Sequence, residues 1–388
     1  MKLHCDIQLP ASKSESNRAL MIAAYGGFDP DFQNLSESND TQVLANALRA
    51  INDKSAVIDI ADCGTAARFM TTYLACHEGE WLLTGTERMK QRPIQPLVEA
   101  LLALGADVQY AEKEGFLPIQ IHGKSIQGGK VAVSMTRSSQ FVSSLLLAAP
   151  IFPQGLELEL VGELNSLPYL EMTLSMMRHF CADVERRGRT IIVLPKPYQS
   201  NRFMVSPDWS AASYWYEMAA FSEECEIKLK SLSLTRGQQH LQGDAVIAEW
   251  MSQLGVGTFE VDDGVVLRKN PFEKRHLSFD FSLYPDLYPT MVATCAGLNV
   301  EATFTGFDNL AAKESNRVEA MQTELAKLSQ RPLHFCAHND HRVVMALAPL
   351  AILCGPVTFD HPEVVEKSYP RFWEDASFLQ MMPFFGAY

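Results

Sequence analysis

The sequence lacks the cysteine spacing that a disulfide framework or a zinc site needs. Its eight cysteines are scattered, and no two of them form a C-x-x-C pair. Scattered cysteines are typical of reduced thiols in a cytosolic compartment. Residues 1–6 also lack the apolar core of a signal peptide. We therefore expect a cytoplasmic protein without structural disulfides.

Long apolar runs and an excess of basic residues are missing as well. The longest apolar run, residues 343–357, is interrupted by Pro349, Gly355 and Pro356. It falls short of the ~20 residues that a membrane helix needs, so no membrane span is expected. The formal net charge of -13 disfavours non-specific binding to nucleic acid. An anionic small substrate stays compatible with this charge, because cations gather in short motifs.

What the chain does contain is enough apolar material for substantial cores. Its 388 residues are 47% hydrophobic and 20% charged, and no low-complexity tract interrupts them. A globular protein of two domains is the expectation for this length and composition.

The first motif with chemical content lies at residues 12–18, SKSESNR. It precedes an apolar run of small residues that reads as a buried helix. Serines at a helix start satisfy free backbone N–H groups, and these groups together with the helix dipole attract anions. Lys13 and Arg18 add two cations. A lone motif of this kind is more often a capped helix than an anion site.

Similar polar clusters recur along the chain, which indicates an internally repeated architecture. Polar clusters open further helices of small and apolar residues at 62–68, 137–141, 208–212, 284–286 and 339–342. Amphipathic helices are predicted between them, at 40–48, 93–105, 168–184, 244–256, 317–328 and, more weakly, 369–382. Short strands complete six units of about 65 residues, each a β-α-β-α-β-β unit. Three units per domain place the boundary near residues 205–208.

Seven motifs in order, across residues 12–367, resemble the EPSP synthase (3-phosphoshikimate 1-carboxyvinyltransferase) family of enolpyruvyl transferases. They are SKS..NR at 12–18, GTA.R at 64–68, RPI at 92–94, SSQF at 138–141, PD at 285–286, KE..R at 313–317 and NDHR at 339–342. Each motif is weak alone, and their order and spacing make the resemblance strong.

The resemblance implies an α/β (α+β) fold: a two-domain inside-out α/β barrel with helices inside and sheets outside. Six β-α-β-α-β-β repeats are shared equally between the domains. It also implies a discontinuous first domain at residues 1–11 and 207–388, a second domain at 12–206, and an active site in the cleft between them.

The resemblance further implies the reaction. The 5-hydroxyl of shikimate 3-phosphate adds to C2 of phosphoenolpyruvate (PEP) while C3 is protonated. The tetrahedral intermediate then loses phosphate, a step on the shikimate pathway to chorismate and the aromatic amino acids. No metal, nucleotide or redox cofactor and no nucleic-acid or membrane partner is implied, and a monomer is expected.

Site residues carry over by motif. Asp286 is the candidate base for the 5-hydroxyl, Glu314 the candidate acid toward C3, and Lys13 a second acid or base. Shikimate 3-phosphate would be bound by Lys13, Ser14, Arg18, Ser138, Ser139, Gln140, Ser166, Tyr169, Asp286, Asn309 and Lys313. PEP would be bound by Lys13, Gly64, Arg68, Arg92, Gln140, Arg317, His341, Arg342 and Lys367. Arginine suits both anions because its fork binds two oxygens at once.

Ordinary structural interpretations compete with several of these roles. Asp286 after Pro285 is a common N-cap pattern, and the pair at 313–314 normally lies on a solvated helix face. Asp340 is expected to cap a helix, and Cys63 to be a small buried side chain without a reactive role.

Three positions depart from the family pattern. Asp62 stands where Asn usually opens the PEP-binding turn, Phe69 where Pro is common, and Leu167 where Lys is usual. The Asp62 carboxylate either weakens PEP binding or caps the helix as Asn would.

Two alternative functions remain at this point. The sister enzyme that transfers enolpyruvyl to UDP-N-acetylglucosamine typically has a catalytic cysteine where this chain has Glu87, five residues before Arg92. A catalytically impaired paralogue that binds an anion would not need Lys13, Asp286 and Glu314, which this chain retains.

Overall fold

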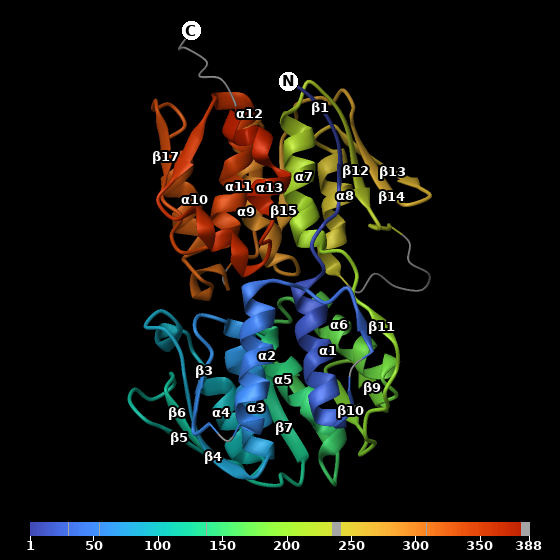
Figure 1. The fold of residues 1–388 in the computed structure, drawn as a ribbon, viewed down its shortest axis with the longest axis vertical. Helices are drawn as coiled ribbons and strands as arrows, with labels where there is room; N and C mark the ends of the chain where they lie inside the picture. The colour runs from blue at the N-terminus through green and yellow to red at the C-terminus, as the bar shows by residue number, and fades with distance from the viewer. Residues whose placement is uncertain (30, 54, 137, 235–241, 308, 382–388) are drawn as a thin grey trace. The chain divides into compact units, whose positions relative to one another are not determined.

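The computed structural model describes residues 1–29, 31–53, 55–136, 138–234, 242–307 and 309–381. Arg137 and residue 382, which fall in predicted helices, lie outside these ranges. The chain divides into two compact units, residues 13–205 and residues 1–12 with 206–388 (Figure 1). We call them the middle unit and the terminal unit.

In the middle unit, sheets lie around three buried helices. Its interior helices are α1 (Lys13–Gly26), α3 (Gly64–Cys76) and α5 (Ser139–Ala148), and its amphipathic helices are α2 (Asn39–Asn52), α4 (Gln95–Ala103) and α6 (Leu167–His179). One sheet has the order β3-β4-β6-β5, with β3 (Val57–Asp59), β4 (Gly79–Thr84), β6 (Ile119–Gly123) and β5 (Asp107–Tyr110). The second has the order β7-β8-β10-β9, with β7 (Gly129–Ser134), β8 (Leu156–Val161), β10 (Thr190–Val193) and β9 (Val184–Arg187). The third pairs β11 (Phe203–Met204) with β2 (Phe32–Gln33) in parallel.

The terminal unit repeats this plan. Its interior helices are α7 (Trp209–Phe221), α9 (Tyr288–Gly297) and α11 (His341–Leu347); α8 (Ile247–Ser252), α10 (Arg317–Leu325), α12 (Ala351–Cys354) and α13 (Phe372–Asp375) complete the set. One sheet has the order β1-β12-β14-β13, with β1 (Lys2–Ile7), β12 (Glu224–Lys230), β14 (Gly264–Lys269) and β13 (Val256–Val261). Two parallel pairs follow, β15 (Leu277–Asp280) with β16 (Ala302–Thr305), and β17 (Leu333–Phe335) with β18 (Val357–Phe359). Strand β1 enters this unit by parallel pairing with β12, Leu3 opposite Cys225.

Residue pattern explains which elements lie inside. In α5 nine of the ten residues are buried, as expected of a helix that is apolar or small on every face. In β8 the leucines at 156, 158 and 160 are buried and alternate with more exposed residues, the period of a strand with one covered face. Within each unit the helices therefore form the interior and the sheets the outside, which confirms the predicted fold class.

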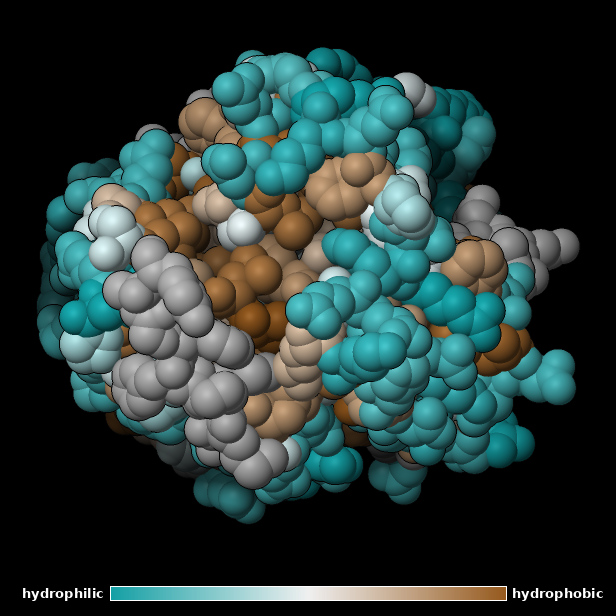
Figure 2. All heavy atoms as spheres, turned by 90° about the horizontal axis from the view of Figure 1, so that it is seen from above, coloured by the Kyte–Doolittle hydropathy of each residue, from teal (hydrophilic) through white to brown (hydrophobic). Residues whose placement is uncertain are grey.

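Figure 2 looks onto the terminal unit from above the view of Figure 1, at the end where the N-terminus lies. Apolar residues gather near the centre of this face, with hydrophilic residues above them and to their right. No helix in the described ranges is both long and apolar enough to cross a bilayer.

Two expectations from the sequence are wrong in detail. Three of the six sheets have only two strands in the described ranges, so those units are shorter than β-α-β-α-β-β. The helix predicted at 369–382 is instead α13 followed by a 3₁₀ turn, η8 (Ser377–Met381). Tertiary contacts decide the second case: Trp373 donates to the Pro362 carbonyl at 2.8 Å and the Tyr369 hydroxyl donates to Asp375 at 2.8 Å.

Candidate functional site

The N-terminus of α1 carries the first group of predicted site residues. The Lys13 ammonium lies 3.0 Å from the Asp40 carboxylate, and both side chains are largely buried. The buried Arg18 guanidinium donates to the Ser14 carbonyl at 2.9 Å and to the Thr173 hydroxyl at 2.7 Å. Burial lowers the pKa of Arg18 to about 10. Two cations are thus fixed at the start of one interior helix, where the helix dipole also attracts anions.

Phe69, one of the departures from the family pattern, belongs to this group. Its ring is 1% exposed. The Arg18 guanidinium carbon lies 5.9 Å from its centroid, within the range of a cation–π contact. The substitution therefore adds an aromatic face beneath a site arginine.

The N-terminus of α3 carries the second group. Arg68 donates to the Gly64 carbonyl at 3.0 Å and to the Pro93 carbonyl at 2.9 Å. A Cβ atom on Gly64 would lie 2.7 Å from Nη1 of Arg92, closer than real Cβ contacts come. The absence of a side chain at Gly64 is therefore what lets the Arg92 guanidinium approach the helix start.

The cap of α3 corrects one sequence interpretation. Cys63, not Asp62, is the N-cap residue, and its sulfur accepts a hydrogen bond from the Ala66 backbone N–H at 3.3 Å. Cys63 is fully buried, as predicted, whereas Asp62 lies exposed in the preceding turn. The interpretation of Asp62 as a substitute cap is wrong.

The third group lies at the starts of α5 and α6. Ser138 caps α5, Ser139 is buried, and the Gln140 amide donates to the Thr65 hydroxyl of α3 at 3.0 Å. Ser166 precedes α6 in a left-handed conformation with φ 58°, and the Tyr169 carbonyl accepts from Arg18 at 3.3 Å. The middle unit thus brings the starts of its interior helices together around Arg18 and Gln140.

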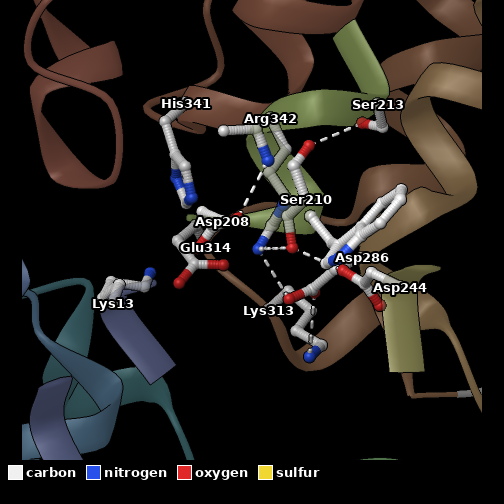
Figure 3. A network of polar contacts seen from close by, with 12 residues as sticks. Lys13, Asp208, Ser210, Ser213, Asp244, Asp286, Lys313, Glu314, His341 and Arg342 are labelled. Carbon is white, nitrogen blue, oxygen red and sulfur yellow. Dashed lines mark hydrogen bonds and ion pairs between the residues drawn. The ribbon is translucent and has the colours of Figure 1, made fainter. Parts of the chain in front are cut away.

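In the terminal unit, Asp286 lies among three cations, two of which, Lys313 and Arg342, are labelled in Figure 3. Its two oxygens accept from Arg317 at 2.9 Å and from Arg342 at 2.7 Å, and the Lys313 ammonium lies 3.5 Å away. The Asp286 side chain is 14% exposed, so its carboxylate is accessible to a ligand but only partly hydrated. It belongs to the 3₁₀ turn η4 (Pro285–Leu287), and α9 begins only at Tyr288, so the N-cap interpretation is wrong.

Arg317, 1% exposed, joins three carboxylates. Besides Asp286 it binds Glu314 at 2.8 Å and Asp340 at 2.9 Å. Burial opposes its charge, but Asp340, Glu314 and Asp286 together raise the pKa of Arg317 above its ordinary value. Asp340 also caps α11, as predicted, by accepting from the Arg342 backbone N–H at 3.0 Å.

The remaining predicted residues of this unit are mostly buried. Lys313 and Glu314 precede α10 with 26% and 12% of their side chains exposed, so the solvated-face interpretation is wrong. Burial and the neighbouring Arg317 lower the pKa of Lys313. Asn309, His341 and Lys367 are 5%, 1% and 6% exposed.

Asp244 and Ser210 lie beside the charged residues of this unit, and the sequence interpretation did not name either as a candidate site residue. The Ser210 hydroxyl donates to Asp244 and lies 3.5 Å from the Arg342 guanidinium. Burial, and then the charge of Asp286, raise the pKa of Asp244 to about 6. An acidic residue in the first turn of a helix is common, so Asp244 has no local signal that would identify it.

Asp244→Asn is expected to stabilise the terminal unit above pH 6 and to leave its stability unchanged near pH 4. A carboxyl whose pKa rises from 3.8 to about 6 on folding binds its proton more tightly in the folded state. The contribution of the Asp244 carboxyl to stability is therefore present below pH 4 and is lost as the pH rises to about 6. At pH 8 the free energy of unfolding of Asp244→Asn should exceed that of wild type by about 1–3 kcal/mol. Urea unfolding at pH 4 and at pH 8 measures the difference. Asp262→Asn, at an exposed position, is the control; an equal change at pH 4 and pH 8 would contradict the prediction.

Within the described ranges, no group of three or more His, Cys, Asp or Glu side chains is arranged to hold a metal ion.

The predicted site residues form two charged groups, one in each unit. The middle unit holds Lys13, Ser14, Arg18, Gly64, Arg68, Arg92, Ser138, Ser139, Gln140, Ser166 and Tyr169, and the terminal unit holds Asp286, Asn309, Lys313, Glu314, Arg317, His341, Arg342 and Lys367.

Known proteins resemble the chain along nearly its whole length. The family model for EPSP synthase (3-phosphoshikimate 1-carboxyvinyltransferase) matches residues 50–376. A 3-phosphoshikimate 1-carboxyvinyltransferase of Bacteroides fragilis is 43% identical over 396 residues, covering 96% of this chain and 95% of the relative. The protein of the same name from Mannheimia succiniciproducens is 32% identical over 421 residues, covering 96% and 95%. An EPSP synthase structure from Acinetobacter baumannii superposes with a TM-score of 0.73 at 19% identity, covering 98% of this chain and 96% of that one, which shows the shared fold.

Proposed function

The chain belongs to the EPSP synthase family, and on that premise we propose that it transfers the enolpyruvyl group of PEP to the 5-hydroxyl of shikimate 3-phosphate. Phosphate is released by addition and elimination through a tetrahedral intermediate. The observation that carries the proposal is the partly exposed Asp286 carboxylate, whose oxygens are both oriented by arginines. A base aimed at a hydroxyl beside bound anions needs such orientation and such cations.

The residue roles follow the chemistry. Asp286 accepts the proton of the 5-hydroxyl, Glu314 delivers a proton toward C3 of PEP, and Lys13 acts as a second acid or base. The residues that bind shikimate 3-phosphate in this proposal are Lys13, Ser14, Arg18, Ser138, Ser139, Gln140, Ser166, Tyr169, Asp286, Asn309 and Lys313. Those that bind PEP are Lys13, Gly64, Arg68, Arg92, Gln140, Arg317, His341, Arg342 and Lys367.

In this proposal, residues of both charged groups take part in one reaction. The acid–base candidates are divided, with Lys13 in one unit and Asp286 and Glu314 in the other. We further propose a cytoplasmic monomer.

The test is phosphate release by the purified protein with PEP and either shikimate 3-phosphate or UDP-N-acetylglucosamine as acceptor. Release with shikimate 3-phosphate alone is the expected result. Release with the sugar nucleotide would favour the sister enzyme, although Glu87 is 87% exposed and pairs with Lys90 at 3.1 Å. Binding of both substrates without release would favour the impaired paralogue.

Gly64→Ala is expected to raise the KM for PEP by about tenfold or more, equivalent to ~1.4 kcal/mol. The new methyl group would lie within 3 Å of the Arg92 guanidinium, which must turn away from the start of α3. Because the displaced atoms are the end of a flexible side chain, the unfolding midpoint should change little. Steady-state kinetics with each substrate varied measures the effect. The KM for shikimate 3-phosphate is the internal control, and an equal rise in both values would contradict the prediction.

A further inference from the structure

The segment that leads into Asp340 has an unfavourable backbone conformation. It runs from the end of β17 to the start of α11 at His341, and both His338 and Asn339 have φ 51°. Positive φ is uncommon for residues other than glycine, although Asn and His tolerate it better than most. Two such residues in succession persist only where surrounding contacts hold them. We call residues 336–339 the α11 entry loop.

Glu324 supplies such contacts from α10. Its side chain is 1% exposed, and both of its oxygens are engaged. Oε2 accepts from the Cys336 backbone N–H at 2.9 Å and from the Lys327 ammonium at 2.6 Å, and Oε1 lies 2.9 Å from Nε2 of His338. Loss of this buried carboxylate would leave the Cys336 backbone N–H without its acceptor, so Glu324 fixes the loop groups around it.

Glu324 and Arg317 hold the same loop from the same side of one helix. They are seven residues apart on α10, which is close to two full turns, so their side chains leave the same face. Glu324 binds Cys336 and His338 of the entry loop, and Arg317 binds Asp340, the residue that directly follows the loop, at 2.9 Å. On another side, the Ala337 N–H donates to Asp360 at 2.7 Å.

We propose that Glu324 is a positioning residue for the reaction: through Cys336 and His338 it fixes the α11 entry loop, so that Asp340 meets Arg317 and α11 directs Arg342 toward Asp286. The inference rests on the proposed function for its catalytic consequence. Glu324 is outside the residues assigned to either substrate, and its action passes through the loop. Displacement of a positioning group such as Arg342 by about 1 Å is enough to slow a reaction about 100-fold.

Kinetics separates this role from one in stability alone. Glu324→Ala should lower kcat/KM for PEP by about 10- to 100-fold, with the KM for shikimate 3-phosphate within about twofold of wild type. Glu324→Gln should recover most of the loss, because its amide oxygen can still accept from Cys336. Lys327→Ala removes a Glu324 contact that does not involve the loop, and it should behave like wild type. A kcat/KM for PEP within twofold of wild type in Glu324→Ala would overturn the proposal.

Hydrogen–deuterium exchange tests the positioning independently of turnover. Peptides covering residues 336–344 should exchange faster in Glu324→Ala, and should be unchanged in Lys327→Ala. If Glu324→Ala fails to fold, His338→Ala removes one loop contact at a side chain that is 29% exposed and should show the same direction with a smaller effect. Unchanged exchange in the folded variants would overturn the proposal. A wild-type protein without phosphate release would instead refute the proposed function, while the exchange result would still judge the loop.

Discussion

Asp286→Asn should lower kcat by about 100- to 10,000-fold, the contribution of a positioned general base. The amide keeps the size of the carboxylate, and its single oxygen can still accept from one of the two arginines, Arg317 or Arg342. It cannot take the proton of the 5-hydroxyl. Binding of PEP and shikimate 3-phosphate should therefore be retained much better than turnover. Phosphate release in single-turnover experiments, with substrate binding measured by calorimetry, gives the two quantities separately.

The matched control is Asp280→Asn, which changes an exposed carboxylate at the end of β15. It should leave both kcat and binding unchanged. An Asp286→Asn enzyme that retains more than about a tenth of wild-type kcat would mean that another group takes the proton. Lys13 and Glu314 would then be the residues to replace next.

Arg317→Met should destabilise the terminal unit by about 3–5 kcal/mol. The substitution removes the one guanidinium that joins Asp286, Glu314 and Asp340, and it leaves the fully buried Asp340 without that counter-charge. For a unit of this size the unfolding midpoint should fall by roughly 6–20 °C. Calorimetry on the intact chain measures the transition.

Arg268→Met is the control for loss of an arginine as such. Arg268 pairs with Glu226 at the surface, with about half of each side chain exposed (50% and 55%). Exposed pairs contribute at most about 1 kcal/mol, so its midpoint should shift little. A comparable fall of the unfolding midpoint in both variants would contradict the prediction that the buried cluster stabilises the unit more than an exposed ion pair does. The unfolding midpoint of Arg317→Lys should lie between those of wild type and Arg317→Met, because one ammonium cannot reproduce the contacts of a guanidinium with three carboxylates.

Local sequence signals predicted the helix starts well. The clusters near Gly64, Ser138, Asp208 and Asp340 all lie where interior helices begin. Three of their N-cap residues are Ser or Asp, and the side chain of each accepts a hydrogen bond from a backbone N–H as expected. Capping needs only a side-chain oxygen and a backbone N–H two or three residues away, so sequence suffices to find it. The cap at α3 was harder, because Cys63 supplies it with a sulfur atom.

Element lengths were less predictable, because packing rather than periodicity determined them. The segment predicted at 369–382 has enough apolar residues for one long helix, yet its described part forms the short helix α13 and a 3₁₀ turn, with contacts from Trp373 and Tyr369. Strand number per sheet likewise depends on whether a segment finds a neighbouring edge, which the sequence of that segment does not contain.

The sequence by itself determined the kinds of element, the helix starts, the family and the types of charged residue at the candidate site. Only the tertiary structure decided which charges meet. Asp286, Arg317 and Arg342 come from three separate elements, and Asp244 and Glu324 join their surroundings from two more positions along the chain. The physical reason is that ion pairing depends on distance and burial, which the fold sets, whereas a sequence with 33 basic and 46 acidic residues allows far too many pairings to choose among.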